Sequence, residues 1–185
     1  DNSSNKEVYV RIPNLEIRKC FKNDIQKRFS SVFIKHNLHN KLVDALSCGN
    51  QKETYDIFFD MIQKYVSIRD TATKAPLENY YHGFINGIFT SCEKLISEYH
   101  SNYETGNGYP DILFKDIDCR KVAIIEIKSA SIGSDIETLS EKAISQIIDK
   151  NYAEPFMSNK TVKHIHGYGI AFAGKSCFIS VKKIK

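Results

Sequence analysis

Two acidic residues and a lysine lie in or next to apolar runs in the second half of the chain, and their spacing suits hydrolytic chemistry. Glu126 and Lys128 belong to the segment Val122–Ser129, whose apolar and β-branched residues predict a strand covered on both faces. Side chains alternate along a strand, so Glu126 and Lys128 share a face about 7 Å apart. Asp111 opens another short apolar run, and neighbouring strands would place it beside Glu126.

Two carboxylates and a lysine at one edge of a sheet fit phosphodiester hydrolysis assisted by Mg²⁺ or Mn²⁺. Carboxylate oxygens are hard ligands for such ions. The ion polarises a phosphoryl oxygen and makes bound water a better nucleophile, and the lysine can orient that water or stabilise the developing charge. The alternative from the residues alone is an ion pair that caps two strand ends.

The composition predicts an ordinary globular protein. The chain has 185 residues, of which 42% are hydrophobic and 26% are charged, enough for one domain with a sizeable core. No apolar run approaches the length of a membrane span and no signal-peptide pattern is present, so we expect no membrane partner. Five scattered cysteines without a Cys-x-x-Cys pair favour an intracellular, cytoplasmic protein. The first residue is Asp1, which fits a fragment of a larger polypeptide.

The first 70 residues predict a helical segment that packs on the rest of the chain. Apolar residues at helical spacing indicate helices over about 13–35, 42–46 and 53–66, the second closed by Gly49. Small polar residues over 69–76 indicate a linker, so we divide the chain into a prefix, 1–70, and a core, 71–185. No chemistry is visible in the prefix.

The core predicts a helix, three strands, a helix and two more strands. The first helix runs from about Pro76 to Tyr99, and the strands cover about 102–105, 110–114 and 122–129. Apolar residues from Ile136 to Ile148 indicate the second helix, and the last strands cover 166–173 and 177–181.

Several short motifs follow one another in an order that resembles a known family. Pro110-Asp111, a gap of fourteen residues, and Glu126-Ile127-Lys128 resemble the signature of the PD-(D/E)XK nuclease superfamily. Further matching pieces cover roughly residues 12–182: Pro13-Asn14-Leu15-Glu16-Ile17, Tyr81-His82-Gly83-Phe84, Glu104-Thr105-Gly106-Asn107-Gly108, Gln146 with Tyr152, and Gly167–Lys175. Together they resemble the nuclease domain found at the C-terminus of AAA-ATPase-like proteins. That group usually has Arg where this chain has Tyr109.

The resemblance implies a fold and a set of site residues. The fold is α/β (α+β): a restriction-endonuclease-like core with a mixed central sheet flanked by helices, preceded by the helical prefix. Asp111 and Glu126 would bind the metal, with Glu78 or Glu104 completing the ligand set and His82 as a further contact. Lys128 and Gln146 would act in catalysis, with Tyr152 near the substrate. Alternatives from the residues are a helix-dipole role for Glu78, a core role for His82, a surface Gln146 and a packing Tyr152.

The leading interpretation is a metal-dependent nuclease acting on DNA, with RNA not excluded. From Pro155 to the C-terminus the chain carries six lysines and no acid, which suits a phosphate-facing surface that includes Lys175. A solvated basic tail would have the same composition. Two other functions fit the same residues: an inactive nucleic-acid-binding or protein-interaction module, and the nuclease part of a toxin or effector acting in a host cell.

Two motifs suggest chemistry that their surroundings do not support. Gly169–Ser176 matches the P-loop pattern, but its middle residues are apolar and a strand-like segment follows it, so we predict a hairpin turn. His164 and His166 share one side of a strand. Two ligands do not make a metal site.

Overall fold

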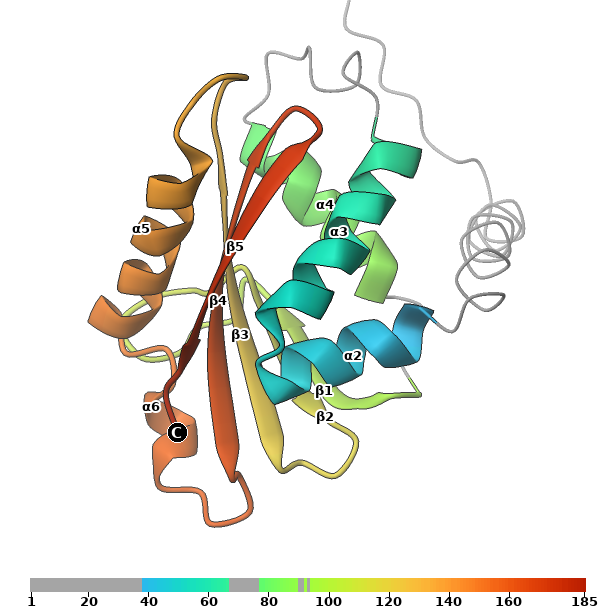
Figure 1. Cartoon of the computed structure of the whole chain (residues 1–185). Coiled ribbons are helices and arrows are strands. Elements are labelled where there is room, and N and C mark those ends of the chain that lie inside the picture. The colour runs from blue at the N-terminus through green and yellow to red at the C-terminus, as the bar shows by residue number, and fades with distance from the viewer. Residues whose placement is uncertain (1–37, 67–76, 90–91, 93) are drawn as a thin grey trace, which may run out of the picture.

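Five strands form one mixed sheet that has helices on both faces (Figure 1). The computed structural model describes residues 38–66, 77–89, 92 and 94–185. The sheet order is β1-β2-β3-β4-β5, and the pair β3–β4 is parallel while the other pairs are antiparallel. The strands are β1 (Ile96–Ser101), β2 (Ile112–Asp116), β3 (Lys121–Ser129), β4 (His164–Ala173) and β5 (Ser176–Lys183). The predicted fold class, a mixed central sheet flanked by helices, is confirmed.

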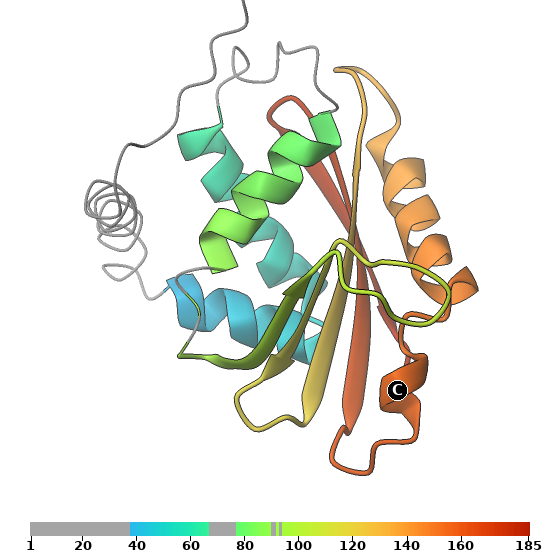
Figure 2. The same ribbon diagram turned by 180° about the vertical axis from the view of Figure 1, so that it is seen from behind.

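The helices divide between the two faces of the sheet, which Figures 1 and 2 show from opposite sides. One face is covered by α2 (Leu38–Cys48), α3 (Gln51–Tyr65) and α4 (Leu77–Phe89). The other is covered by α5 (Ile136–Asp149) and the short α6 (Glu154–Met157). The crossover from β3 to β4 runs through α5, as a parallel pair requires. None of the described helices is long and apolar enough to cross a membrane.

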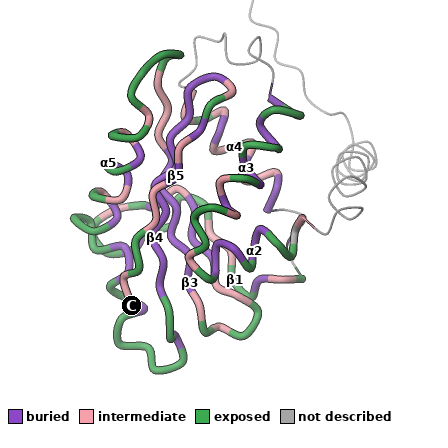
Figure 3. The backbone as a smooth tube through the Cα atoms, in the orientation of Figure 1, coloured by how far each residue is buried: buried purple, intermediate pink, exposed green. Residues whose placement is uncertain are grey.

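The central strands β3 and β4 are buried on both sides (Figure 3). Alternate side chains of β3 therefore contact the helices on opposite faces of the sheet. Ala123, Ile125 and Ile127 belong to the core under α2, α3 and α4. Val122 and Ile124 belong to the core under α5 and α6. This alternation confirms the predicted faces of β3 and places Glu126 on the α5 side.

Helix ends follow local chemistry. Asn50 caps α3, because its side chain accepts a hydrogen bond from the backbone N–H of Glu53 at 3.2 Å. Gly49 follows α2 with a φ of +74°, a left-handed conformation that commonly ends a helix. Both α2 and α3 are longer than the helices predicted over 42–46 and 53–66. The predicted helix over 13–35 lies outside the described residues, and the division at residue 70 stays a prediction.

One boundary prediction was wrong. The helix expected to continue to Tyr99 ends at Phe89, and β1 occupies Ile96–Ser101. Ile96 and Tyr99 fit a helical repeat in sequence, but pairing with β2 supplies their backbone with hydrogen-bond partners across a sheet. Short apolar runs do not distinguish these two structures by periodicity alone.

The strand expected over 102–105 is a loop. Asn102 has a φ of +53° and Gly106 a φ of +57°, so the chain turns twice where a strand would stay extended. A single bridge between Thr105 and Gly108 remains. The P-loop pattern lies across β4, a turn and β5, which confirms the predicted hairpin.

Candidate active site

Glu126 is a charged side chain in an apolar strand, with only 3% of its surface exposed. Its Oε1 accepts hydrogen bonds from Lys128 Nζ at 2.8 Å and from Gln146 Nε2 at 2.5 Å. Its other oxygen, Oε2, is buried and has no partner among the described residues. A buried carboxylate oxygen without a donor is costly. Oε2 of Glu126 is therefore a candidate contact for a bound ligand.

Asp111 lies directly before β2, where the ladder of the sheet ends. The pairing of Ile112 with Ile125 places Asp111 next to Glu126 along the neighbouring strand. Asp111 Oδ2 accepts a hydrogen bond from the backbone N–H of Ile127 at 2.6 Å. The side chain thus takes the place of a strand partner, which fixes the carboxylate at the edge where Glu126 is buried. Lys128 lies on β3 as predicted, so the structure brings the three signature residues together.

Burial disfavours the ionisation of both carboxylates, and the charge of Asp111 adds to this effect on Glu126. Burial and the neighbouring charge of Asp111 raise the pKa of Glu126 to about 7, although Lys128 acts in the opposite direction. Burial also raises the pKa of Asp111, against the hydrogen bond from Ile127 and the charges of His82 and Lys128. A shared cation would relieve both effects because it favours the charged forms.

Lys128 responds to the same group of acids. Burial alone would lower its pKa. The hydrogen bond to Glu126 and the charges of Glu126, Glu78 and Asp111 outweigh burial, so the pKa of Lys128 is raised. Lys128 is therefore a full cation at neutral pH, placed among three acids.

Helix α4 brings two predicted residues near the carboxylates. Glu78, in its first turn, is half-buried, and its charge acts on both Glu126 and Lys128. One turn later, Nε2 of His82 lies 3.1 Å from the backbone oxygen of Asp111 and 3.0 Å from Ser101 Oγ. His82 therefore holds the backbone of Asp111 in place.

Gln146 and Tyr152 connect Glu126 to the loop before Asp111. Gln146, on α5, also points Nε2 to the Tyr152 hydroxyl at 3.3 Å. That hydroxyl donates to the backbone oxygen of Tyr109 at 3.2 Å. Tyr152 is buried, with 2% of its surface exposed. The chain of contacts runs from Glu126 through Gln146 and Tyr152 to Tyr109, two residues before Asp111.

Two predicted residues lie apart from this cluster. Glu104 is exposed in the loop between β1 and β2, with no hydrogen bond to the carboxylates among the described contacts. Lys175 lies at the tip of the β4–β5 hairpin, and its Nζ donates to the backbone oxygen of Gln63 in α3 at 3.0 Å. The return contact, from Gln63 Nε2 to the Lys175 oxygen, measures 2.8 Å. The hairpin tip is thus attached to α3, and roles for Glu104 and Lys175 stay predictions.

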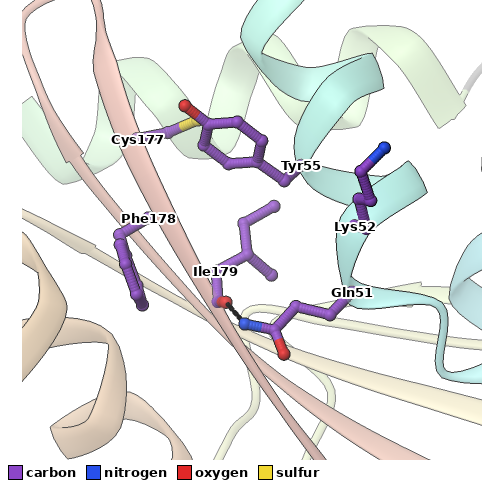
Figure 4. Close-up of a pocket in the computed structure, with 6 residues that line it drawn as sticks. All are labelled: Gln51, Lys52, Tyr55, Cys177, Phe178 and Ile179. Carbon is purple, nitrogen blue, oxygen red and sulfur yellow. Dashed lines mark hydrogen bonds between the residues drawn. The ribbon is translucent and has the colours of Figure 1, made fainter.

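A cavity of about 430 Å³ lies between α3 and β5 (Figure 4). Its lining contains no acidic residue: Gln51, Lys52, Tyr55, Cys177, Phe178 and Ile179. Gln51 donates to the backbone oxygen of Ile179 at 2.7 Å across it. Cys177 and Ile179 belong to the core under α2, α3 and α4, whereas Glu126 faces α5. The cavity is therefore separate from the carboxylate cluster.

Sequence reasoning did not identify Gly169 as a residue that shapes the site. Gly169 pairs with Glu126 across β3 and β4. A Cβ atom at this position would lie 2.0 Å from the backbone oxygen of Ser140 and 3.0 Å from Ala143 Cβ, both in α5. The glycine lets α5 approach the sheet beside Glu126, within reach of Gln146. The available signal was a glycine inside a strand pattern, which marks close approach of another backbone.

The carboxylate cluster fits a divalent cation held mainly by two acids. The described residues contain no group of three or more His, Cys, Asp or Glu side chains placed to hold a metal. Asp111 and Glu126, whose Oε2 is unpartnered, offer hard oxygen ligands, which suit Mg²⁺ or Mn²⁺ and leave positions for water or phosphate. His164 and His166, with ring centroids 6.4 Å apart, form no such group either.

Comparison with known proteins agrees with the geometry. A search of curated proteins finds no match to the chain. The family model for the PD-(D/E)XK nuclease superfamily matches residues 77–182, more than half of the sequence, and this range contains Asp111, Glu126, Lys128 and Gln146. The chain therefore belongs to the PD-(D/E)XK nuclease superfamily.

Proposed function

We propose that this protein is a metal-dependent nuclease that hydrolyses phosphodiester bonds in DNA. The observation that carries the proposal is the buried Glu126, whose Oε2 has no partner among the described residues while Asp111 and Lys128 lie beside it. Members of the superfamily are generally nucleases and typically use divalent metals. An ion pair that only capped two strands would not need a second, partly buried acid and an unpaired oxygen.

Asp111 and Glu126 are the proposed ligands of Mg²⁺ or Mn²⁺. Glu78 is the better candidate for a third acid, because its charge acts on Glu126 and Lys128, whereas Glu104 is exposed in its loop. When bound, the ion would polarise a phosphoryl oxygen and make water a better nucleophile. Oδ2 of Asp111 already accepts from Ile127 N–H, so the position of this carboxylate does not depend on the metal.

The remaining residues position the two carboxylates and the substrate, or stabilise the negative charge that develops in the reaction. Lys128 carries a full charge held against Glu126, ready to donate to water or to a phosphoryl oxygen as negative charge develops. Gln146 holds Oε1 of Glu126, which leaves Oε2 for the ligand, and orients substrate. Tyr152 fixes Gln146, and His82 fixes the backbone of Asp111. These contacts make the site rigid before substrate arrives.

The wider setting is part of the same proposal. Cys48, Cys92, Cys119 and Cys177 are free, which supports an intracellular location. Lysines of the basic segment from Pro155 to the C-terminus, such as Lys160, Lys163 and Lys175, supply phosphate contacts to DNA. The resemblance in sequence suggests an AAA-ATPase-like domain in the same polypeptide.

A cleavage assay tests the function. Purified protein is incubated with labelled DNA and RNA, in single-stranded and duplex form, with Mg²⁺, Mn²⁺ or a chelator. We expect metal-dependent cleavage of DNA that Asp111→Ala and Glu126→Ala abolish, while circular dichroism shows an intact fold, because either change removes a metal ligand. Wild-type rates in either variant would refute the assignment of the site. No cleavage by wild type with any metal, together with nucleic-acid binding, would favour an inactive binding module.

A further inference from the structure

Two exposed tyrosines lie in the loop between β1 and β2, which leads to Asp111. Tyr109, two residues before Asp111, is 56% exposed, and Tyr103, at the start of the same loop, is 45% exposed. The Tyr103 ring stacks on His100, with centroids 4.2 Å apart and planes at 26°. Large aromatic rings usually bury most of their surface. Two such exposed rings beside a candidate active site are candidates for contact with a ligand.

The stacked pair lies on the same face of the sheet as Glu126. Tyr99 packs into the core under α4, so the next residue of β1, His100, points to the opposite face, where α5 lies. His100 pairs with Leu113 of β2, and Leu113 pairs with Ile124 of β3. His100 is therefore two strand spacings from Ile124, roughly 10 Å. Glu126 is two residues further along β3.

The tip of the loop that carries the tyrosines is hydrogen-bonded to the turn between α5 and α6. The backbone N–H of Asn107 donates to the Lys150 oxygen at 2.8 Å, and Thr105 Oγ1 donates to the Tyr152 oxygen at 3.3 Å. A Cβ atom on Gly106 would lie 2.3 Å from the backbone oxygen of Asn151, so this residue must be glycine. Figure 2 shows the loop crossing from β1 toward the end of α5 and returning to β2. The rings therefore stand on a firmly placed backbone.

The charge of this loop does not suit the backbone of a duplex. Residues 102–111 contain no lysine or arginine and carry two acids, Glu104 and Asp111. Contacts to duplex phosphates depend on lysine and arginine. Aromatic rings instead stack on bases, and only unpaired bases expose their faces. The combination of exposed rings and a loop without cations favours single strands over duplexes at this loop.

We infer that the nuclease takes its substrate as a single strand, with bases stacked on Tyr109 and on the Tyr103–His100 pair. This inference rests on the proposed function, because it makes the stacked strand the substrate of the same carboxylates. Tyr109, which is exposed and two residues before Asp111, would hold the nucleotide beside the scissile phosphate. The Tyr103–His100 pair binds a base further along the strand.

Binding without cleavage tests the inference directly. Fluorescence anisotropy is measured in chelator with labelled single-stranded DNA of about 20 nucleotides, the same sequence as a blunt duplex, and single-stranded RNA. We expect tighter binding of the single strand than of the duplex. Tyr103→Ala and Tyr109→Ala should each weaken single-strand binding about 5- to 150-fold, the range for one lost base stack. Tyr109→Phe should bind within about 2-fold of wild type, because the ring remains.

Controls separate stacking from charge and from misfolding. The exposed Phe59, which stacks on Tyr55 in α3, provides a matched aromatic deletion, and Phe59→Ala should leave binding unchanged. Tyr109→Leu keeps an apolar side chain without a π face and should behave like Tyr109→Ala. The slope of log affinity against log salt should stay the same in the tyrosine variants, since no phosphate contact is lost. Tyr152 holds Tyr109 through its backbone oxygen, so these substitutions leave that contact intact.

The outcomes of binding and cleavage can be told apart. A preference for duplex, or equal single-strand binding by wild type and both alanine variants, overturns the inference even if the protein cleaves DNA. Ring-dependent single-strand binding without cleavage by any metal overturns the proposed nuclease and leaves a single-strand binding site. Faster cleavage of single strands than of duplex, reduced by Tyr109→Ala at subsaturating substrate, supports both. A preference for RNA in the binding arm would assign the strand as RNA.

Discussion

The two faces of the central sheet use buried side chains in different ways. Under α2, α3 and α4, the core is continuous and apolar, and rings such as Tyr81 and Phe172 stack with centroids 4.3 Å apart. Under α5 and α6, the apolar cluster is smaller, and Glu126, Gln146 and Tyr152 form a buried polar chain beside it. The same strand, β3, contributes to both faces.

The difference shows where stability and chemistry are placed. Removing apolar surface from water is the main stabilising contribution to a fold, and the α2–α4 side removes most of it. The α5 side holds a carboxylate away from water, which costs free energy but strengthens its interaction with a cation. The larger apolar face therefore offsets the cost of the polar one.

The largest effect on stability should come from the α2–α4 side. Phe172 is fully buried and stacked on Tyr81, so Phe172→Ala should lower the free energy of unfolding by about 3–5 kcal/mol, through lost burial and a cavity. Phe156, in the smaller cluster and 8% exposed, is the matched change on the other side, and Phe156→Ala should cost less. Urea unfolding measures both. An equal or larger loss for Phe156→Ala would contradict the comparison of the two faces.

A smaller effect, seen in catalysis and hardly in stability, should come from Lys128. Lys128→Ala should lower single-turnover cleavage by roughly 100-fold, the scale for one preorganised donor. DNA affinity should change little, because one phosphate contact among several contributes little. Lys115, held by Glu98 at 2.8 Å, is a matched strand lysine in an ion pair, and Lys115→Ala should leave cleavage unchanged. Weaker DNA binding with unchanged turnover in Lys128→Ala would make it an ordinary phosphate contact.

Much of the catalytic strand could be predicted because its signals are local. Alternation over Val122–Ser129 gives the face of each side chain, and the charged residues of that strand stand out against its apolar pattern. The adjacency of Asp111 and Glu126 also follows, since two short strands joined by a polar turn pair as neighbours. The structure agrees with both.

The remaining features depend on contacts between distant segments. The start of β2 is delayed to Ile112 because Pro110 has no N–H and the Asp111 side chain takes the next ladder bond. The approach of α5 to Glu126 depends on Gly169, and the placement of Lys175 depends on Gln63 in α3. A single sequence shows these residues but not their partners. The end of α4 and the start of β1 were missed for the same reason.

The last effect is visible only as a pH dependence of stability. It concerns the free energy cost of keeping the buried Glu126 ionised. Its pKa is about 7 in the folded protein and near 4.5 when the chain is unfolded, so the folded state binds more protons between these values. The contribution of Glu126 to the stability of the metal-free protein should therefore fall as pH rises from about 4.5 to 7, while His166, whose pKa is lowered by burial, contributes in the opposite direction. Glu126→Gln removes the Glu126 contribution and should be more stable than wild type by about 3 kcal/mol near pH 7.5, with the difference fading toward pH 4.5.

The same titration also tests whether a bound metal ion removes the free energy cost of ionising Glu126. Urea unfolding of wild type and Glu126→Gln across pH 4.5–8 gives the two curves, and Glu141→Gln, the same substitution at an exposed position on α5, is the control for the loss of one acid. Millimolar Mg²⁺ should stabilise wild type most at high pH, where both carboxylates are ionised, and should not stabilise Glu126→Gln. A stability difference between Glu126→Gln and wild type that does not grow with pH in chelator would mean that Lys128 outweighs burial and Asp111, because this difference cancels the titration of His166. Holding Glu126 ionised on the α5 face would then cost no free energy, and the contrast between the two faces would weaken.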